Sequence, residues 1–184
     1  MKIVAIGDSI TEGFPYSPQE SWVEHVAREL NVEILNQGIC GELTRDMRAR
    51  FRRDVLAFAP SHVIILGGAN DAAARYPLAS INANFIAMVE MSRQHGIISI
   101  LGLPIPSLLP EDEKFLMEYR NWLKDYAGRE GFPYIDFYSS FLNAMQLGQA
   151  GKVYVDEVHP SREGYKLMGE TAVQSLLSIL PHLK

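Results

Sequence analysis

The chain has 184 residues, 47% of them hydrophobic and 21% charged, which fits a globular protein and excludes a disordered, collagenous or coiled-coil chain. Its 17 Lys and Arg against 22 Asp and Glu give a net charge of −5, which argues against non-specific nucleic-acid binding. The single cysteine, Cys40, excludes an intramolecular disulfide framework and an all-cysteine zinc site.

Five short apolar runs rich in β-branched residues are predicted to be strands, in chain order at residues 2–6, 32–35, 62–66, 97–101 and 134–137. Such runs are typical of parallel strands that are buried on both faces. They alternate with longer segments in which apolar residues recur at helical spacing. These recurring sets are Ile81, Phe85 and Met88; Phe115, Tyr119, Trp122 and Tyr126; and Tyr165, Met168, Ala172 and Leu176.

The alternation of strand and helix predicts a parallel sheet with helices on both faces, that is, a three-layer α/β/α sandwich. No linker, repeat or low-complexity tract divides the sequence, so we predict a single domain over residues 1–184. Ser161 is the expected N-cap of the last helix, and Gly96 and Gly131 stand where helix C-caps belong. Segments 103–112 and 143–155, which contain Pro or Gly, are predicted to be loops.

Four polar segments stand just after a predicted strand or just before the last helix: residues 7–11, 36–44, 67–71 and 156–160. The carboxyl ends of the strands form the crevice in which open α/β sheets bind ligands. We therefore expect these four segments, far apart in the sequence, to converge at one edge of the sheet.

Ser9 follows the first strand and should open a helix, where backbone N–H groups and the helix dipole lie close by. Its hydroxyl is a weak nucleophile unless a base accepts its proton, and taken alone Ser9 is more simply interpreted as an N-cap. His159 is the candidate base, because it lies in a short polar turn three residues after Asp156, which could orient the ring. The same two residues could instead cap the final helix.

Asn70 and Gly41 are candidate donors to a developing oxyanion, because acyl transfer needs fixed donors aimed at that oxygen. Asn70 offers a side-chain NH₂ beyond the third strand, and Gly41 a backbone N–H with no side chain in the way. Taken singly, each has a simpler interpretation, Asn70 at a helix start and Gly41 as a turn glycine.

Together the four segments resemble the SGNH hydrolases, also called GDSL-type lipases and esterases. The blocks occur in the order of that family and span almost the whole chain. They are Gly7-Asp8-Ser9 with Ile10-Thr11-Glu12-Gly13, Asn36-x-Gly38-x-x-Gly41-x-Leu43-Thr44, Gly67-Gly68-Ala69-Asn70-Asp71, and Asp156-x-x-His159-Pro160.

The resemblance implies a flavodoxin-like, five-stranded parallel sheet and a serine ester hydrolase that needs no metal and no cofactor. It implies Ser9 as nucleophile, His159 as base and Asp156 as the residue that orients it. It also implies oxyanion donation from the N–H groups of Ser9 and Gly41 and from the side chain of Asn70. The expected partner is a small-molecule acyl ester, and the oligomeric state is left open.

For the substrate we expect a short-chain acyl or acetyl ester, with a thioesterase or lysophospholipase-type acylhydrolase as the alternative. A non-catalytic flavodoxin-like binding module is the alternative of a different class. A receiver-type module would need clustered acidic residues after the first strand, where only Asp8 stands. An aspartyl phosphatase would need a second carboxylate where Ile10 stands.

Several further residues have two interpretations. Phe14 and Tyr16 could line an acyl pocket or be ordinary core aromatics, and Cys40 is interpreted as a packed thiol rather than a nucleophile. Five arginines crowd one predicted helix, and acidic residues interspersed among them favour a solvated face over an anion site. They are Arg45, Arg48, Arg50, Arg52 and Arg53.

The first residues bear on the compartment. Asp8 interrupts the apolar run after Met1 and Lys2, and no later apolar run approaches the length that spans a bilayer. We therefore expect a cytoplasmic protein without stable membrane insertion, although a signal removed ahead of this sequence would leave no trace in it.

Overall fold

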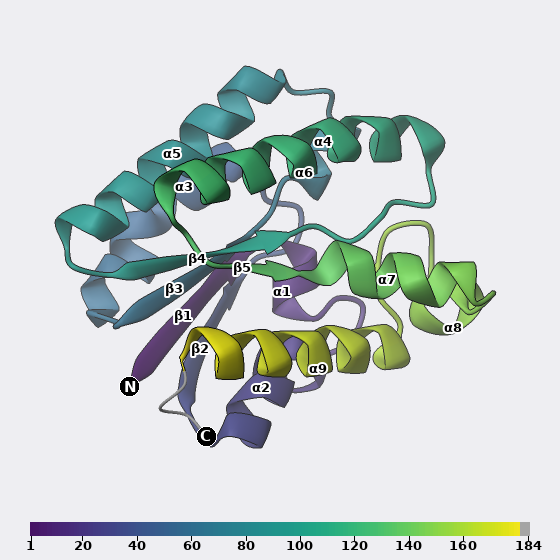
Figure 1. Cartoon of the computed structure of the whole chain (residues 1–184), viewed down its shortest axis with the longest axis horizontal. Coiled ribbons are helices and arrows are strands. Elements are labelled where there is room, and N and C mark those ends of the chain that lie inside the picture. Colours follow the sequence, from purple (N-terminus) through teal and green to yellow (C-terminus); the bar gives the residue numbers. More distant parts are fainter. Residues whose placement is uncertain (181–184) are drawn as a thin grey trace.

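Within the described part of the chain, five parallel strands form one sheet in the order β2-β1-β3-β4-β5. Figure 1 shows this computed structural model. The structure describes residues 1–180, so the last four residues of the predicted domain lie outside the described part. The strands are β1 (Lys2–Gly7), β2 (Glu33–Gly38), β3 (His62–Leu66), β4 (Ile98–Leu103) and β5 (Tyr134–Asp136).

Helices cover both faces of the sheet, and short helices fill several of the connections. One layer contains α2 (Trp22–Leu30), α7 (Phe137–Gln146) and α9 (Arg162–Ile179), and the other contains α3 (Thr44–Asp54), α5 (Leu78–Gln94) and α6 (Pro110–Glu130). The shorter helices are α1 (Ser9–Glu12), α4 (Ala69–Ala73), α8 (Ala150–Val153) and the 3-10 helices Pro18–Glu20 and Leu56–Phe58.

The period of two along β1 divides the core between the two layers. Ile3 and Ala5 pack with α2, α7 and α9, whereas Val4 and Ile6 pack with α3, α5 and α6. All four side chains are fully buried, as expected for a strand in the middle of a sheet that is covered on both faces. The predicted three-layer α/β/α arrangement with five parallel strands is confirmed.

The predicted strands are all present, with bounds that shift by a few residues. The last one ends at Asp136 rather than at residue 137, because the Asp136 carboxylate caps α7 by accepting a hydrogen bond from the Ser139 N–H. The prediction of a loop over residues 143–155 is wrong in part, since α7 continues to Gln146 and α8 follows. Segment 103–112 is irregular only until Pro110, which occupies the first turn of α6, where its missing N–H costs nothing.

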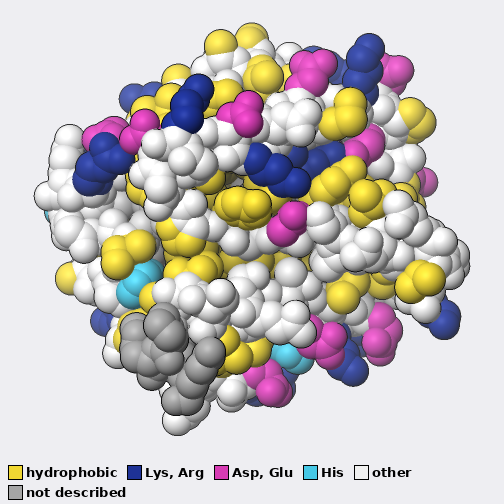
Figure 2. All heavy atoms as spheres, in the orientation of Figure 1, with side chains coloured by type: hydrophobic (Ala, Val, Ile, Leu, Met, Phe, Trp, Pro, Cys, Tyr) yellow, Lys and Arg dark blue, Asp and Glu magenta, His cyan; other side chains and the backbone are white. Residues whose placement is uncertain are grey.

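Basic and acidic side chains are interspersed on the face of the molecule that Figure 2 shows, rather than gathered into a patch of one sign. No helix among residues 1–180 has the length and apolar character needed to cross a membrane.

Candidate active site

The strand order brings the polar segments together. β1 lies between β2 and β3, and Gly7 at its end is in register with Gly38 of β2 and Leu66 of β3. The segments that follow these three strands therefore leave neighbouring points of one sheet edge. This accounts for the convergence expected for Ser9, Gly41 and Asn70.

Ser9 occupies the first position of α1, in a turn that Asp8 fixes. The Asp8 carboxylate is the N-cap, since its Oδ1 accepts a hydrogen bond of 3.0 Å from the Ile10 N–H, so the capping interpretation of Ser9 is wrong. A Cβ on Gly7 would lie 2.4 Å from the Leu66 carbonyl oxygen, so this turn requires glycine there. The Ser9 hydroxyl is nearly buried and faces His159.

His159 links Ser9 to Asp156. The Ser9 Oγ lies 3.2 Å from His159 Nε2, and His159 Nδ1 lies 2.8 Å from Asp156 Oδ2. Because a carboxylate can only accept, Nδ1 carries the proton of the neutral ring and Nε2 accepts the serine hydroxyl hydrogen. The 156–159 turn is closed by the Val155 N–H, which donates to the His159 carbonyl oxygen at 3.0 Å.

The Asp156 carboxylate also organises its own turn. Its Oδ1 accepts hydrogen bonds from the backbone N–H groups of Val158, at 2.8 Å, and of His159, at 2.6 Å. Partial burial alone would raise the pKa of Asp156, but these bonds and the His159 ring outweigh it and hold the pKa below its ordinary value. The N-cap of α9 is Ser161, as predicted, so the interpretation of Asp156 and His159 as helix caps is wrong.

Gly41 and Asn70 lie in two segments that are bonded to each other. Gly41 is exposed, with a φ of +80° that favours glycine. Asn70 is the second residue of α4, whose N-cap is Gly68, and its Nδ2 donates to the Glu42 carbonyl oxygen at 2.9 Å. Asn70 is therefore not the N-cap of α4. Its side-chain amide instead bonds to the loop that carries Gly41.

Sequence reasoning assigns no role to Asp71 and Asn36, which lie in the motif segments. Asp71 is buried and accepts hydrogen bonds from both the N–H and the hydroxyl of Thr44, at 2.9 and 2.7 Å. The Asn36 amide nitrogen donates to the Thr11 carbonyl oxygen at 2.8 Å. Their only signal in the sequence was their place inside the quoted blocks.

The Asp8 carboxyl has an unusual environment. It is buried, and burial raises its pKa to about 6, while the Ile10 N–H and the charge of His159 act in the opposite direction. A second buried carboxyl, that of Asp71, adds to the upward shift. The site therefore contains a carboxyl whose charge changes in mildly acidic solution.

The aromatic candidates occupy different places. The Phe14 ring is 40% exposed and packs edge-on against the His159 ring, with centroids 4.7 Å apart, so it borders the triad. The Tyr16 ring is half-buried. It packs against the Tyr165 ring, at 6.3 Å between centroids, and against the Arg162 guanidinium, 4.2 Å from the ring centre.

The proline-containing segment after β4 is held by hydrogen bonds to neighbouring elements. The guanidinium of buried Arg120 lies against the carbonyl oxygens of Pro104 and Ile105, and the Tyr154 hydroxyl donates to the Pro106 carbonyl oxygen. At the end of this segment the Leu108 N–H donates to the carbonyl oxygen of Glu157, within the turn of His159, at 2.8 Å. Residues 104–107 are buried, and this segment supports the 156–159 turn through the Leu108 hydrogen bond.

Two interpretations of the helix and loop after β2 need correction. Cys40 is exposed rather than packed. Arg45, Arg48, Arg52 and Arg53 form the predicted solvated face of α3, but Arg50 is only 7% exposed and points inward. The pattern predicts a surface residue at this position because its acidic partners, Glu42 and Asp54, resemble the interspersed charges of a solvated helix.

The chain matches the GDSL-like lipase/acylhydrolase family over residues 5–167, and it belongs to that family. It is a carboxylic ester hydrolase of that family. No group of three or more His, Cys, Asp and Glu side chains within residues 1–180 is arranged to hold a metal ion.

Three relatives are similar over most of their length. An uncharacterized lipoprotein of Bacillus subtilis, YqeF, is 31% identical, with 77% of this chain and 72% of the relative covered. An acetylxylan esterase of Geobacillus stearothermophilus is 23% identical, with 95% and 93% covered. The crystal structure of a lipolytic G-D-S-L family protein from Veillonella parvula is 28% identical, with 95% and 97% covered and a TM-score of 0.87.

Proposed function

We propose that the chain hydrolyses esters through a covalent acyl-enzyme on Ser9, with His159 as general base and acid and Asp156 as the residue that orients His159. The observation that carries this proposal is the continuous chain of contacts from Ser9 Oγ to His159 Nε2, at 3.2 Å, and from His159 Nδ1 to Asp156 Oδ2, at 2.8 Å. This is the arrangement in which a base activates a serine hydroxyl while a carboxylate fixes the tautomer of that base.

In the first half-reaction Ser9 Oγ bonds to the ester carbonyl carbon while its proton passes to His159 Nε2. The tetrahedral intermediate then collapses, the bond to the alcohol oxygen breaks, and His159 returns the proton to the departing alcohol. In the second half-reaction water attacks the acyl carbon, His159 accepts a proton from that water, and Ser9 leaves with the proton. The products are the acid and the alcohol, and the enzyme is restored.

Negative charge develops on the carbonyl oxygen in both tetrahedral intermediates. We assign its stabilisation to three donors, the N–H groups of Ser9 and Gly41 and the side-chain nitrogen of Asn70. Their segments follow the adjacent ends of β1, β2 and β3, and this supports their assignment to one site. Donors held in place before the reaction need no reorganisation when the charge appears, which makes them effective.

The substrate class that we propose is an ester with a short acyl group, such as an acetyl ester of a sugar. The similarity to the acetylxylan esterase over 95% of this chain supports an acetyl group as the acyl part of the substrate. At an identity of 23%, the similarity does not define the alcohol part of the ester. Phe14, exposed beside the His159 ring, is the aromatic side chain that would contact a group bound at Ser9. Tyr16 is the weaker candidate, because its ring already packs against other side chains.

The test is a panel of p-nitrophenyl esters of increasing acyl length, together with acetylated xylo-oligosaccharides and acyl-CoA thioesters, assayed with the wild type and Ser9→Ala. A fluorophosphonate probe should label the wild type once and leave Ser9→Ala unlabelled. Ser80→Ala, which removes an exposed serine of α5, is the matched control and should behave as the wild type. Turnover by purified Ser9→Ala would remove the mechanism, and preference for thioesters or long acyl chains would replace the substrate class.

A further inference from the structure

The loop that carries Gly41, residues 39–43, is the most exposed part of the proposed oxyanion site. Ile39, Cys40 and Gly41 are all exposed, and a Cβ on Gly41 would meet no other atom within 4 Å. Packing therefore does little to fix the loop. Its position has to come from polar contacts, since a donor that is displaced by an ångström loses most of its effect on a reaction.

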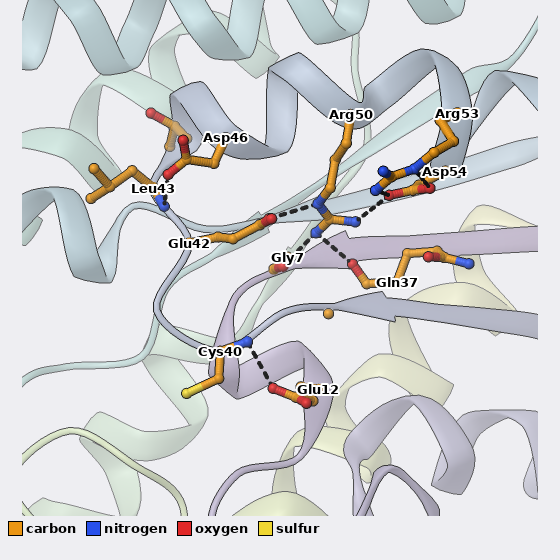
Figure 3. Close-up of polar contacts among 12 residues, drawn as sticks. Gly7, Glu12, Gln37, Cys40, Glu42, Leu43, Asp46, Arg50, Arg53 and Asp54 are labelled. Atoms are coloured by element: carbon orange, nitrogen blue, oxygen red, sulfur yellow. Dashed lines mark hydrogen bonds and ion pairs between the residues drawn. The ribbon is translucent and has the colours of Figure 1, made fainter.

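Arg50 contacts four points around this loop (Figure 3). Its Nε donates to Glu42 Oε2 at 2.6 Å, and its Nη1 to Asp54 Oδ2 at 3.2 Å. Its Nη2 donates to the carbonyl oxygens of Gly7, at 3.1 Å, and of Gln37, at 2.8 Å. One guanidinium thus joins the loop, the end of β2 and the last residue of β1, two residues before Ser9.

The loop is held from other sides as well. The Glu12 carboxylate, on the helix that Ser9 opens, accepts a hydrogen bond of 2.7 Å from the Cys40 N–H, the donor next to Gly41 (Figure 3). The Ile39 N–H donates to the Gly7 carbonyl oxygen at 3.1 Å. The Gly7 carbonyl oxygen therefore accepts hydrogen bonds from both Arg50 and the start of the loop. The same strand end thus fixes the position of the Gly41 loop and the position of the Ser9 turn.

Two carboxylates, those of Glu42 and Asp54, pair with the Arg50 guanidinium. Partial burial raises the pKa of Glu42, and the hydrogen bond and charge of Arg50 oppose that shift. Asp54 is shared with Arg53, whose hydrogen bond is the largest cause of the lowered pKa of Asp54. A planar fork with five N–H donors can satisfy two carboxylates and two carbonyls at once, which the single ammonium of a lysine cannot do in the same geometry.

We propose that Arg50 is a positioning residue of the ester hydrolase, and that through Glu42 it sets the distance between the Ser9 turn and the Gly41 N–H. This inference rests on the proposed function, because it assigns Gly41 to the oxyanion site. In this role buried Arg50 acts through Glu42 and the loop rather than by contact with the substrate. Its effect falls on kcat, because the loop donor contributes mainly when negative charge develops, and substrate binding in the ground state is largely spared.

The experiment compares Arg50→Lys, Glu42→Gln and the control Arg53→Gln. Arg53 lies on the same helix and pairs with Asp54, but its side chain is 73% exposed and bonds neither the loop nor a strand end. We expect Arg50→Lys to lower kcat by about 10- to 100-fold, Glu42→Gln by a smaller factor, and KM to stay close to the wild-type value in both. Arg53→Gln should keep the wild-type kcat.

A second measurement separates positioning from general damage. Phenylboronic acid forms a tetrahedral adduct with an active-site serine, and its affinity should fall with kcat in Arg50→Lys and Glu42→Gln while the affinity for the product acid is unchanged. If Arg50→Lys does not fold, Glu42→Gln alone decides, since it keeps a side chain of the same shape while it removes the charge and replaces one acceptor oxygen with an NH₂ group. Wild-type kcat in the folded variants, or equal losses in all three including Arg53→Gln, would overturn the inference.

The failure of the proposed function gives a different result. Turnover by Ser9→Ala would end the acyl-enzyme mechanism whatever the Arg50 variants do. An inactive Ser9→Ala together with fully active Arg50→Lys and Glu42→Gln would leave the mechanism standing and remove only the positioning role.

Discussion

The side-chain nitrogen of Asn70 donates a hydrogen bond to the backbone carbonyl oxygen of Glu42, at 2.9 Å. This bond joins the segment after β3 to the loop after β2, and Asp71 strengthens the same connection through its two hydrogen bonds from Thr44. Residues 28 positions apart in the sequence are thereby joined by a hydrogen bond. The donors that we assign to the oxyanion are fixed by contacts between their own segments, before any substrate arrives.

The first prediction concerns Asp156→Asn. Asparagine can still occupy the turn, but its amide no longer offers His159 Nδ1 a charged acceptor, so the ring loses its fixed tautomer and the stabilisation of its protonated form. We expect kcat to fall by roughly 10³- to 10⁴-fold with KM little changed. Steady-state kinetics on p-nitrophenyl acetate would check this, with Glu157→Gln in the same turn as the control.

The lowered pKa of Asp156 sets the direction of the pH dependence. A carboxyl with a depressed pKa in the folded state contributes its stabilising contacts above its unfolded pKa and loses them as the pH falls through the folded value. Asp156 should thus remain ionised to more acidic pH than an ordinary aspartate. A pH titration of the carboxyl by NMR that placed its pKa above the ordinary value would contradict this assignment.

The second prediction concerns the stability of Asp8→Asn. Burial raises the pKa of Asp8 to about 6 from 3.8, so between these values the folded state keeps a proton that the unfolded state has lost. Stability therefore decreases as the pH rises through this window, by roughly 1–3 kcal/mol in total. Asparagine stays neutral and can still accept the Ile10 hydrogen bond as an equally good N-cap.

Asp8→Asn should gain stability relative to the wild type as the pH rises from about 4 to 7, and denaturant unfolding at several pH values in this range would measure the gain. The exposed Asp125 of α6 provides the control Asp125→Asn, whose difference from the wild type should not follow that window. A constant difference for Asp8→Asn across the range would mean that the Asp8 carboxyl is ionised throughout.

The third prediction concerns Cys40 and metals. Although Cys40 is exposed, the protein around it removes part of the water from its thiol, and this desolvation raises the pKa of the thiol. The nearby carboxylates of Glu12 and Asp8 raise the pKa further, so iodoacetamide should label Cys40 more slowly than free cysteine at pH 8. Cys40→Ser should retain the wild-type kcat, because only the backbone N–H of Cys40 bonds to Glu12.

EDTA should also leave kcat unchanged. Loss of activity with EDTA and recovery with zinc would indicate another class of hydrolase.

The fold could be predicted because its signals are local and repeated. Each buried strand is a short apolar run, and each long helix carries its own periodic face, such as Ile81, Phe85 and Met88, all fully buried. One short helix, α8, was missed altogether inside the predicted loop 143–155, and the other errors lie at the ends of elements, where one side chain decides. Asp136 ended β5 by capping α7, and that contact with the Ser139 N–H depends on local geometry that apolar patterning does not encode.

The proposed triad could be placed from the sequence because each of its residues stands in a short polar segment beside a strand or a helix. The residues that hold these segments could not be found in the same way. Arg50 has the surroundings of a surface arginine in the sequence, and only the sheet order brings Gly7 and Gln37 within its reach. The sequence predicts a packed thiol at Cys40. In the structure Cys40 and Gly41, which has a positive φ, lie in a loop that leaves the Cys40 thiol exposed.

The last prediction concerns Asn70→Ala, which separates an oxyanion donor from a purely structural residue. The bond to Glu42 is one hydrogen bond, with a net contribution to stability of about 1 kcal/mol, so losing it would loosen the loop modestly. Losing an oxyanion donor typically lowers kcat by about 10²- to 10³-fold, or roughly 3–4 kcal/mol. We expect the larger effect on kcat, with KM little changed, and Asn70→Asp should be at least as impaired because it presents a negative charge to the developing anion.

Thr44→Val is the matched control for Asn70→Ala. It removes the hydroxyl that donates to Asp71 at 2.7 Å, a contact between the same two segments, but it leaves every proposed oxyanion donor in place. If Asn70 acts on the oxyanion, Thr44→Val should lower the melting temperature at least as much as Asn70→Ala does, while kcat falls far less. Parallel losses of kcat in the two variants, each proportional to its loss of stability, would show that Asn70 only fastens the loop. The oxyanion would then be left to the N–H groups of Ser9 and Gly41.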